Sequence, residues 1–213
     1  MERINLQEGD SRDHLALALK AIRDGYVICA PGDGGYLLLS DAFSEFAVRS
    51  MHVLRGNDLG VAAQVLIHSA ATLPGIAREI SDEVLALAEK FWPGPLSLNL
   101  RPQRGLNWDL GDNNELDRLS VRVPISPFIS TLLKESGPLA SISAAPVGAP
   151  ALVRLEDLSH YAESLTHAFD GGELVATAPS TVVEADLQAM TIIREGAISQ
   201  TLLAEVAPAL SQK

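Results

Sequence analysis

The run FWPGPLSL at residues 91–98 constrains the fold more than any other stretch of this sequence. A helix-like segment precedes it, and an alternating, strand-like segment follows. Pro93 cannot continue a helix, because its ring clashes with the preceding turn and it has no N–H to donate. Gly94 permits a sharp reversal, and Pro95 fixes φ at the entry to the next element. The run therefore predicts a tight helix-to-strand connection beside a packed Trp92.

The composition is ordinary for a globular protein and excludes two kinds of stabilising cross-link. The 213 residues are 47% hydrophobic, which suffices for one domain, or two small ones, with a sizeable core. Only 5% are aromatic, so the core is expected to be mostly Leu, Val, Ile and Ala. The lone cysteine, Cys29, excludes an internal disulfide. Because no Cys and His residues cluster, a structural zinc site is also not expected.

The charge and the chain start bear on partners and location. Binding to a phosphate backbone depends on Lys and Arg, but the net charge is −11 and no basic run is visible. Non-specific binding to nucleic acid is therefore disfavoured as the main activity. The start, Met-Glu-Arg-Ile-Asn, lacks the pattern of a signal peptide, and Pro74 and several polar residues interrupt the longest uncharged run, 60–77. We expect a cytoplasmic protein that does not contact a membrane.

Caps and apolar runs give the expected elements. Helices are expected over about 11–24, 41–54, 82–91, 127–136 and 155–165 and after 199, with N-caps at Asp10 or Ser11, Asp41, Ser81, Ser126 and Ser199. Strands are expected over 26–30, 36–39, 64–67, 96–100, 120–123 and 139–143, with a hairpin from 180–185 and 190–194. The polar stretch 101–119 reads as a loop. With no repeat or linker, residues 1–213 are expected to form one α/β domain with a mixed sheet.

Polar residues gather in short motifs near the ends of these elements. A turn, PGDGGY, occupies 31–36, and Arg-Gly-Asn at 55–57 ends the second helix. The motif VRVP at 121–124 places Arg122 between apolar neighbours. If those neighbours face the core, Arg122 faces the other side of the sheet, toward a cleft. The remaining motifs are SISAA at 141–145, STVV at 180–183 and IIREG at 192–196.

Together with FWPGP, these motifs resemble those of the YrdC-like family, the threonylcarbamoyl-AMP synthases, in the family's order and over about 10–200. The resemblance implies the short, single-domain form: a twisted, mostly mixed or antiparallel sheet with flanking helices and an open cavity. It also implies synthesis of L-threonylcarbamoyladenylate from ATP, bicarbonate and L-threonine. Pyrophosphate is released, and the product serves a tRNA modification, threonylcarbamoyladenosine. Mg²⁺ is expected to accompany ATP.

The resemblance also implies ligand contacts, although it assigns neither a catalytic residue nor a metal ligand. The residues implied for the small substrates are Asp33, Gly34, Arg122 and Ser141. Those implied for the nucleotide and its anionic groups are Arg55, Asn57, Ser143, Ser180 and Arg194.

The chain departs from the family pattern at four positions, and these departures leave two hypotheses. Gly32 and Gly34 replace two hydroxyl residues, Asn57 replaces an Arg, and Ala145 replaces an Asn. Charge-assisted hydrogen bonds are roughly twice as strong as neutral ones, so the loss at Asn57 weakens the expectation of ATP turnover. The first hypothesis is an active synthase. The second is a catalytically impaired paralogue that binds a nucleotide, an acyl-adenylate or RNA, although net acidity disfavours RNA.

Overall fold

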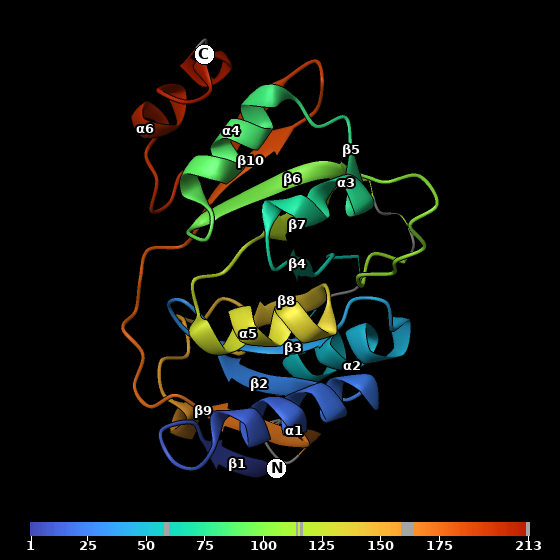
Figure 1. The fold of residues 1–213 in the computed structure, drawn as a ribbon, viewed down its shortest axis with the longest axis vertical. Helices are drawn as coiled ribbons and strands as arrows, with labels where there is room; N and C mark the ends of the chain where they lie inside the picture. The colour runs from blue at the N-terminus through green and yellow to red at the C-terminus, as the bar shows by residue number, and fades with distance from the viewer. Residues whose placement is uncertain (58–59, 114, 116, 159–163, 212–213) are drawn as a thin grey trace.

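The chain folds into one long sheet with helices on both faces, as the sequence predicts (Figure 1). The structure is a computed structural model and describes residues 1–57, 60–113, 115, 117–158 and 164–211. Its strands are β1 (Glu2–Asn5), β2 (Ile28–Pro31), β3 (Tyr36–Asp41), β4 (Gln64–Leu66), β5 (Ala77–Arg78), β6 (Leu96–Pro102), β7 (Leu119–Arg122), β8 (Leu139–Ser143), β9 (His167–Asp170), β10 (Thr181–Ala185) and β11 (Met190–Arg194). The α-helices are α1 (Ser11–Arg23), α2 (Glu45–Arg55), α3 (Leu73–Ile76), α4 (Asp82–Phe91), α5 (Pro127–Ser136) and α6 (Gln200–Ala204). The short 3₁₀ turns are η1 (Ala70–Thr72), η2 (Leu155–Asp157) and η4 (Pro208–Ser211).

The sheet is mixed, which confirms the expected class. Its strand order is β1-β9-β2-β3-β8-β4-β7-β6-β10-β11, and β5 pairs with β6 off this path. The β4–β7 and β6–β10 pairs are parallel, as are β1–β9 and β2–β9. The pairs β2–β3, β3–β8, β4–β8, β6–β7, β5–β6 and β10–β11 are antiparallel. Strands distant in sequence thus become neighbours, and this positions the site.

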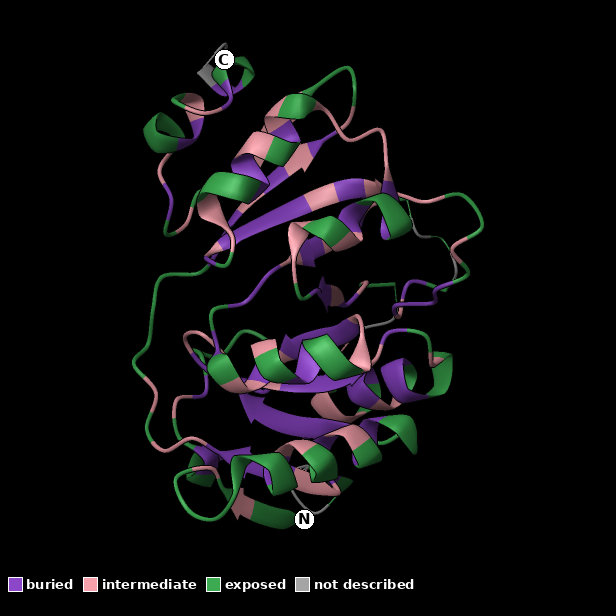
Figure 2. Ribbon diagram, in the orientation of Figure 1, coloured by how far each residue is buried: buried purple, intermediate pink, exposed green. Residues whose placement is uncertain are grey.

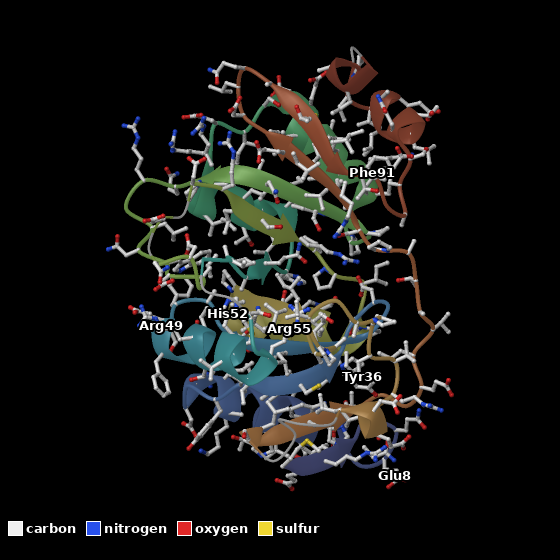
Figure 3. All side chains as sticks on the ribbon, turned by 180° about the vertical axis from the view of Figure 1, so that it is seen from behind. Glu8, Tyr36, Arg49, His52, Arg55 and Phe91 are labelled. Carbon is white, nitrogen blue, oxygen red and sulfur yellow. The ribbon has the colours of Figure 1, made fainter. Side chains whose placement is uncertain are left out.

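The register of the strands sorts their side chains onto two faces. Leu38, Val65 and Leu98 lie on one face, which α2 and α4 cover. Leu39 and Leu66 lie on the other, against α1 and α5. Each strand is rotated relative to its neighbour. Over this many strands the rotation adds up, so one face of the sheet points in different directions at the two ends. In Figure 1, α1, α5 and α4 therefore lie in front, whereas α2 lies behind and comes forward in Figure 3.

The face under α1 and α5 becomes polar farther along the sheet. Beyond α5 it carries Gln64, Ser97, Ser120 and Arg122. Each of these residues is next in its strand to a fully buried Leu or Val, whose side chain points to the opposite face. Gln64 and Arg122 of this set line a cavity. Figure 2 shows the contrast between buried strands and the exposed outer sides of the helices.

The helix ends are mostly as the sequence predicts, with two differences. Asp10 and Ser81 cap α1 and α4, and Gly56 ends α2 in the left-handed conformation. Ser44, not Asp41, caps α2, because β3 extends to Asp41 and its carboxylate accepts from the N–H of Phe43 instead. Pro127 begins α5, but the hydroxyl of Ser126 donates to the Pro31 carbonyl at 2.6 Å rather than capping the helix.

Two stretches differ from their expected conformation. Residues 101–119 are not a simple exposed loop, because β6 extends to Pro102 and Trp108, Asp109 and Leu110 are buried. The N–H of Ala63 donates to the Leu110 carbonyl at 2.7 Å, so this segment packs beside β4. The helix expected over 155–165 appears only as the short turn η2; residues 159–163 lie outside the described residues.

Cys29 is buried, as expected, and burial raises its pKa to about 12, so the thiol stays protonated. None of the described helices has both the length and the apolar character needed to cross a bilayer.

The FWPGP run forms the predicted turn between α4 and β6. The Trp92 indole N–H donates to the Leu96 carbonyl at 2.7 Å, and the N–H of Gly94 donates to the Val123 carbonyl at 3.0 Å. A methyl group on Gly94 would lie closer than 3.0 Å to the Phe91 carbonyl oxygen. Glycine is therefore required here because the chain passes close to itself.

A buried phenol and carboxylate join the end of the sheet to its centre. The Tyr36 hydroxyl lies 2.9 Å from Asp170 Oδ1 and 2.8 Å from the Gly172 carbonyl, and Arg3 Nε donates to Asp170 Oδ2 at 2.7 Å. Burial is the main cause that raises the pKa of Tyr36, and the hydrogen bond to Asp170 raises it further. Burial alone would raise the pKa of Asp170, but hydrogen bonds from Gly172, Arg3 and Tyr36 hold it below its ordinary value.

Substitution of Gly94 by alanine should destabilise the fold. The added methyl group collides with backbone, which cannot rotate away, so we expect a loss of about 2 kcal/mol in the free energy of unfolding. Urea denaturation measures this loss. The matched control is Gly75→Ala, where a methyl group meets nothing within 4 Å. A Gly94→Ala variant as stable as that control would contradict the argument.

The Asp170 carboxylate should make stability depend on pH. Its pKa is lower in the folded state than in the unfolded chain, so its contribution is present above the unfolded pKa of about 4 and is lost as pH falls through the folded value. We expect the stability gap between the native chain and Asp170→Asn to be wide at neutral pH and to narrow in acid. Urea denaturation across this range measures the gap, with Asp157→Asn, in an exposed ion pair, as control. A gap independent of pH would be inconsistent with the assignment.

Candidate functional site

A cavity of about 390 Å³ opens on the polar face of the sheet. It lies where the turn after β2, the ends of β4, β7 and β8, and the segments before β10 and at the end of β11 converge. Six of the residues predicted from the sequence line it: Asp33, Gly34, Arg122, Ser143, Ser180 and Arg194. The fold thus brings together residues from five separate motifs.

An ion pair between Arg122 and Asp33 forms one wall. Arg122 Nη2 lies 2.5 Å from Asp33 Oδ2, and only 17% and 12% of the two side chains are exposed. Asp33 Oδ1 also accepts from the N–H groups of Ile125 and Ser126, at 3.0 and 2.7 Å. The carboxylate therefore fixes the start of α5 as well as the guanidinium. Arg122 faces the cavity, as its alternation with the buried valines predicts.

The second contact of Arg122 comes from the FWPGP run. Arg122 Nε donates to the Gly94 carbonyl oxygen at 2.9 Å, while the Gly94 N–H pairs with the carbonyl of Val123. The turn at Gly94 and the end of β7 are thus joined on both sides. FWPGP packs the scaffold and also orients the guanidinium that faces the ligand space.

Arg194 and four further polar side chains form a second hydrogen-bonded group, and Arg194, Ser180 and Gln64 of this group line the cavity. Arg194 Nη2 donates to the carbonyl and the hydroxyl of Ser180, at 2.9 and 3.1 Å. The hydroxyls of Ser180 and Ser97 lie 2.9 Å apart. Gln64 Nε2 then donates to Ser97 and Ser120, at 2.9 and 3.2 Å. A continuous chain of polar side chains therefore runs from β11 to β4 and includes the cavity residues Arg194, Ser180 and Gln64.

The two arginines place positive charge in one partly enclosed space. Burial lowers the pKa of Arg122, and the nearby charge of Arg194 lowers it further, whereas Asp33 raises it. A guanidinium stays charged even so, because its ordinary pKa is above 12. With Asp33 offsetting one charge, the cavity keeps an excess of positive charge in a chain of net −11, which suits an anionic ligand.

Three predicted site residues lie outside the cavity lining. The Ser141 hydroxyl donates to the Gln64 carbonyl at 3.1 Å, so Ser141 supports a lining residue. Arg55, labelled in Figure 3, donates from Nε to the Ala145 carbonyl at 2.9 Å. The Asn57 amide contacts His52 Nδ1 at 2.8 Å and lines a separate hollow with it.

Among the lining residues that were not predicted from the sequence, Gln64 and Thr177 bring polar groups to the cavity. The signal for Gln64 is its place in a strand as the polar neighbour of buried Val65, the same alternation that identified Arg122. Thr177 lies in an irregular segment with no comparable pattern. Among the described residues, no group of three or more His, Cys, Asp or Glu could hold a metal ion.

Comparisons with known proteins agree with this arrangement. The family model Sua5_yciO_yrdC, described as "Telomere recombination", matches residues 20–196. The chain is 32% identical over 193 residues to a protein of Mycobacterium leprae named putative threonylcarbamoyl-AMP synthase, covering 90% of this chain and 87% of that one. It is 28% identical over 200 residues to the threonylcarbamoyl-AMP synthase of Pyrococcus abyssi, covering 92% of this chain but 57% of the relative.

A solved structure extends the comparison to the fold. The crystal structure of P. abyssi Sua5 complexed with L-threonine matches with a TM-score of 0.86 at 25% identity. The match covers 98% of this chain and 61% of the Sua5 chain, so the present chain spans less than two thirds of that protein.

Removal of the Asp33 charge should destabilise the protein. Asp33→Asn leaves Arg122 largely buried without a counter-charge, and we expect a loss of about 2–3 kcal/mol in the free energy of unfolding. Chemical denaturation measures it. A further Arg122→Met change should cost less in this background than in the native chain, because the two groups act on each other.

The control is Glu45→Gln, in an exposed ion pair on α2, which should leave the denaturation midpoint unchanged. Strictly additive effects of the substitutions at Asp33 and Arg122 would show that their contact contributes nothing.

Proposed function

The chain belongs to the Sua5/YciO/YrdC family, and from this membership we propose that it is a threonylcarbamoyl-AMP synthase. Its substrates in this proposal are ATP, bicarbonate and L-threonine. The observation that carries the proposal is one cavity that is lined by Arg122 and Arg194 and by the polar side chains of Gln64, Ser143 and Ser180. The similarity to a Sua5 structure complexed with L-threonine supports the same substrate class.

In the proposed reaction, the protein supplies position and charge. L-threonine and bicarbonate form N-carboxy-threonine and water. A carbamate oxygen then attacks the α-phosphorus of ATP, and a new oxygen–phosphorus bond forms. The bond from that phosphorus to the bridging oxygen of pyrophosphate breaks, and pyrophosphate leaves with the electron pair. No covalent bond to the protein is needed, so orientation and electrostatic stabilisation are the routes to catalysis.

We assign the two walls of the cavity to the two halves of the product. Arg122, held by Asp33 and the Gly94 carbonyl, binds the threonine moiety. Arg194 and Ser180 bind the nucleotide portion, where guanidinium N–H groups and a hydroxyl meet phosphate oxygens. Ser143 lines the same cavity and lies close enough to contribute a further hydroxyl.

The side chains that line the cavity do not form a magnesium site by themselves. Asp33 contributes a carboxylate, but both of its oxygens already accept hydrogen bonds from Arg122 and two backbone N–H groups. Mg²⁺ usually keeps several waters and binds nucleotide phosphates through few protein ligands. In our proposal Mg²⁺ therefore enters with the triphosphate of ATP, which neutralises part of the developing charge.

The alternative of an impaired paralogue has no observation in its favour over the synthase. It is based on the four changed family positions, Gly32, Gly34, Asn57 and Ala145. The Asn57 amide is engaged with His52, away from the cavity, and the Ala145 carbonyl accepts from Arg55. A cytoplasmic location remains part of the proposal, whereas RNA contact, which net acidity disfavours, is not needed to form the adenylate.

The proposal is tested by supplying ATP, bicarbonate and L-threonine to the purified chain with Mg²⁺. Pyrophosphate release and a threonylcarbamoyl-AMP mass are expected only when all three substrates are present. Arg194→Ala should lower kcat/KM by about 100-fold or more, because a donor that stabilises developing charge is removed. Arg23→Ala, on the exposed side of α1, is the charge-matched control. Absence of adenylate with the native chain would refute the proposal.

A further inference from the structure

An extended segment, residues 171–180, crosses from β9 to β10 beside the cavity and is called the strap here (left side of Figure 1). Both of its ends are held. The Tyr36 hydroxyl lies 2.8 Å from the Gly172 carbonyl, and the N–H of Leu174 donates to the Val153 carbonyl at 2.8 Å. At the far end, the N–H of Ala197 donates to the Pro179 carbonyl at 2.9 Å.

Between these anchors the strap passes directly against the turn that follows β2. A methyl group placed on Gly34 would lie closer than 3.0 Å to the Thr177 hydroxyl oxygen, and 3.1 Å from Thr177 Cβ and backbone nitrogen. The Thr177 hydroxyl thus occupies the space that any side chain at position 34 would need. A side chain at position 34 and the side chain of Thr177 cannot both fit in this space. The threonine fits because residue 34 is a glycine.

The Thr177 hydroxyl is available to a ligand. It lines the same cavity as Arg122 and Asp33, and within the described parts of the chain it makes no hydrogen bond. Packing in the core does not account for a threonine at this position, since Thr177 is exposed like most of the strap. A hydroxyl can both donate and accept, so it can pair with a carboxylate, a carbamate or another hydroxyl.

We infer that Thr177 is a substrate-binding residue: the strap supplies, beside Arg122, the hydroxyl that the glycine turn cannot. The inference rests on the proposed function and names the group that contacts the threonine or carbamate end of the ligand. The glycine at position 34 then does not mean that the site lacks a hydroxyl. The hydroxyl comes instead from Thr177, in a segment that is remote in sequence. Specificity for the small substrate therefore depends on the strap as well as on the β2–β3 turn.

The test removes the hydroxyl without changing the shape. Thr177→Val should weaken L-threonine binding about five- to tenfold in titration calorimetry, the effect of one hydrogen bond lost to a polar ligand. Binding of ATP should change less than twofold. Thr177→Ser, which keeps the hydroxyl, should stay within about twofold of the native chain. The matched control is Val175→Ala, at a strap position that is 81% exposed and outside the cavity lining.

A second set of variants tests the exclusion of volume. Gly34→Thr alone should displace the strap, which increases amide hydrogen exchange over 171–179 and weakens L-threonine binding. Adding Thr177→Gly to that variant makes room for the new side chain and should restore both measurements toward native values. Restoration is expected because the hydroxyl has only moved to the neighbouring position.

The outcomes separate the inference from the proposed function. If the native chain makes the adenylate but Thr177→Val binds L-threonine as tightly, the inference is overturned and the function stands. Equal weakening by Thr177→Val and Thr177→Ser also overturns it, because the hydroxyl would then not be the cause. A native chain that binds no L-threonine overturns both.

Discussion

The ion pair between Arg122 and Asp33 is the contact on which the rest of the site depends. Asp33 lies in the turn after β2, and Arg122 ends β7, on the far side of β8 and β4 in the strand order. The same carboxylate accepts from the start of α5, and the same guanidinium donates to Gly94. One largely buried pair therefore joins a turn, a strand end, a helix start and the FWPGP run, and it sets the spacing of the cavity walls.

The sequence predicted best what local chemistry determines. Most of the helices and strands, the caps at Asp10 and Ser81 and the turn at Gly94 follow from periodicity, capping and the limits of proline, whereas β1, β5, β9 and α3 were not predicted. The position of Arg122 also followed, because alternation along a strand decides which face a side chain takes. Asp41 was misplaced as a cap, since a strand extended by pairing competes for the residue that a helix could use.

Contacts between distant segments explain what the sequence could not reveal. The resemblance assigns Arg55 and Asn57 to the nucleotide site, yet here they pair with the Ala145 carbonyl and with His52. Nothing in the local pattern of the strap marks Thr177, because its environment is created by Gly34, far away in the chain. From the sequence alone, a glycine inside a polar motif indicates a missing side chain. Only the structure shows which neighbour occupies the space that this side chain would need.

The polar chain from Gln64 to Arg194 has a direction. Ser97 accepts from Gln64, and Ser180 accepts from Arg194. If Ser180 donated to Ser97, the proton of the fully buried Ser97 would have no acceptor among the described residues. Ser97 therefore donates to Ser180, and this fills the acceptor positions of Ser180. The hydroxyl proton of Ser180 is then left for the ligand, so the hydrogen bonds from Ser97 and Arg194 make Ser180 an obligate donor, selective for an oxygen that carries no hydrogen of its own.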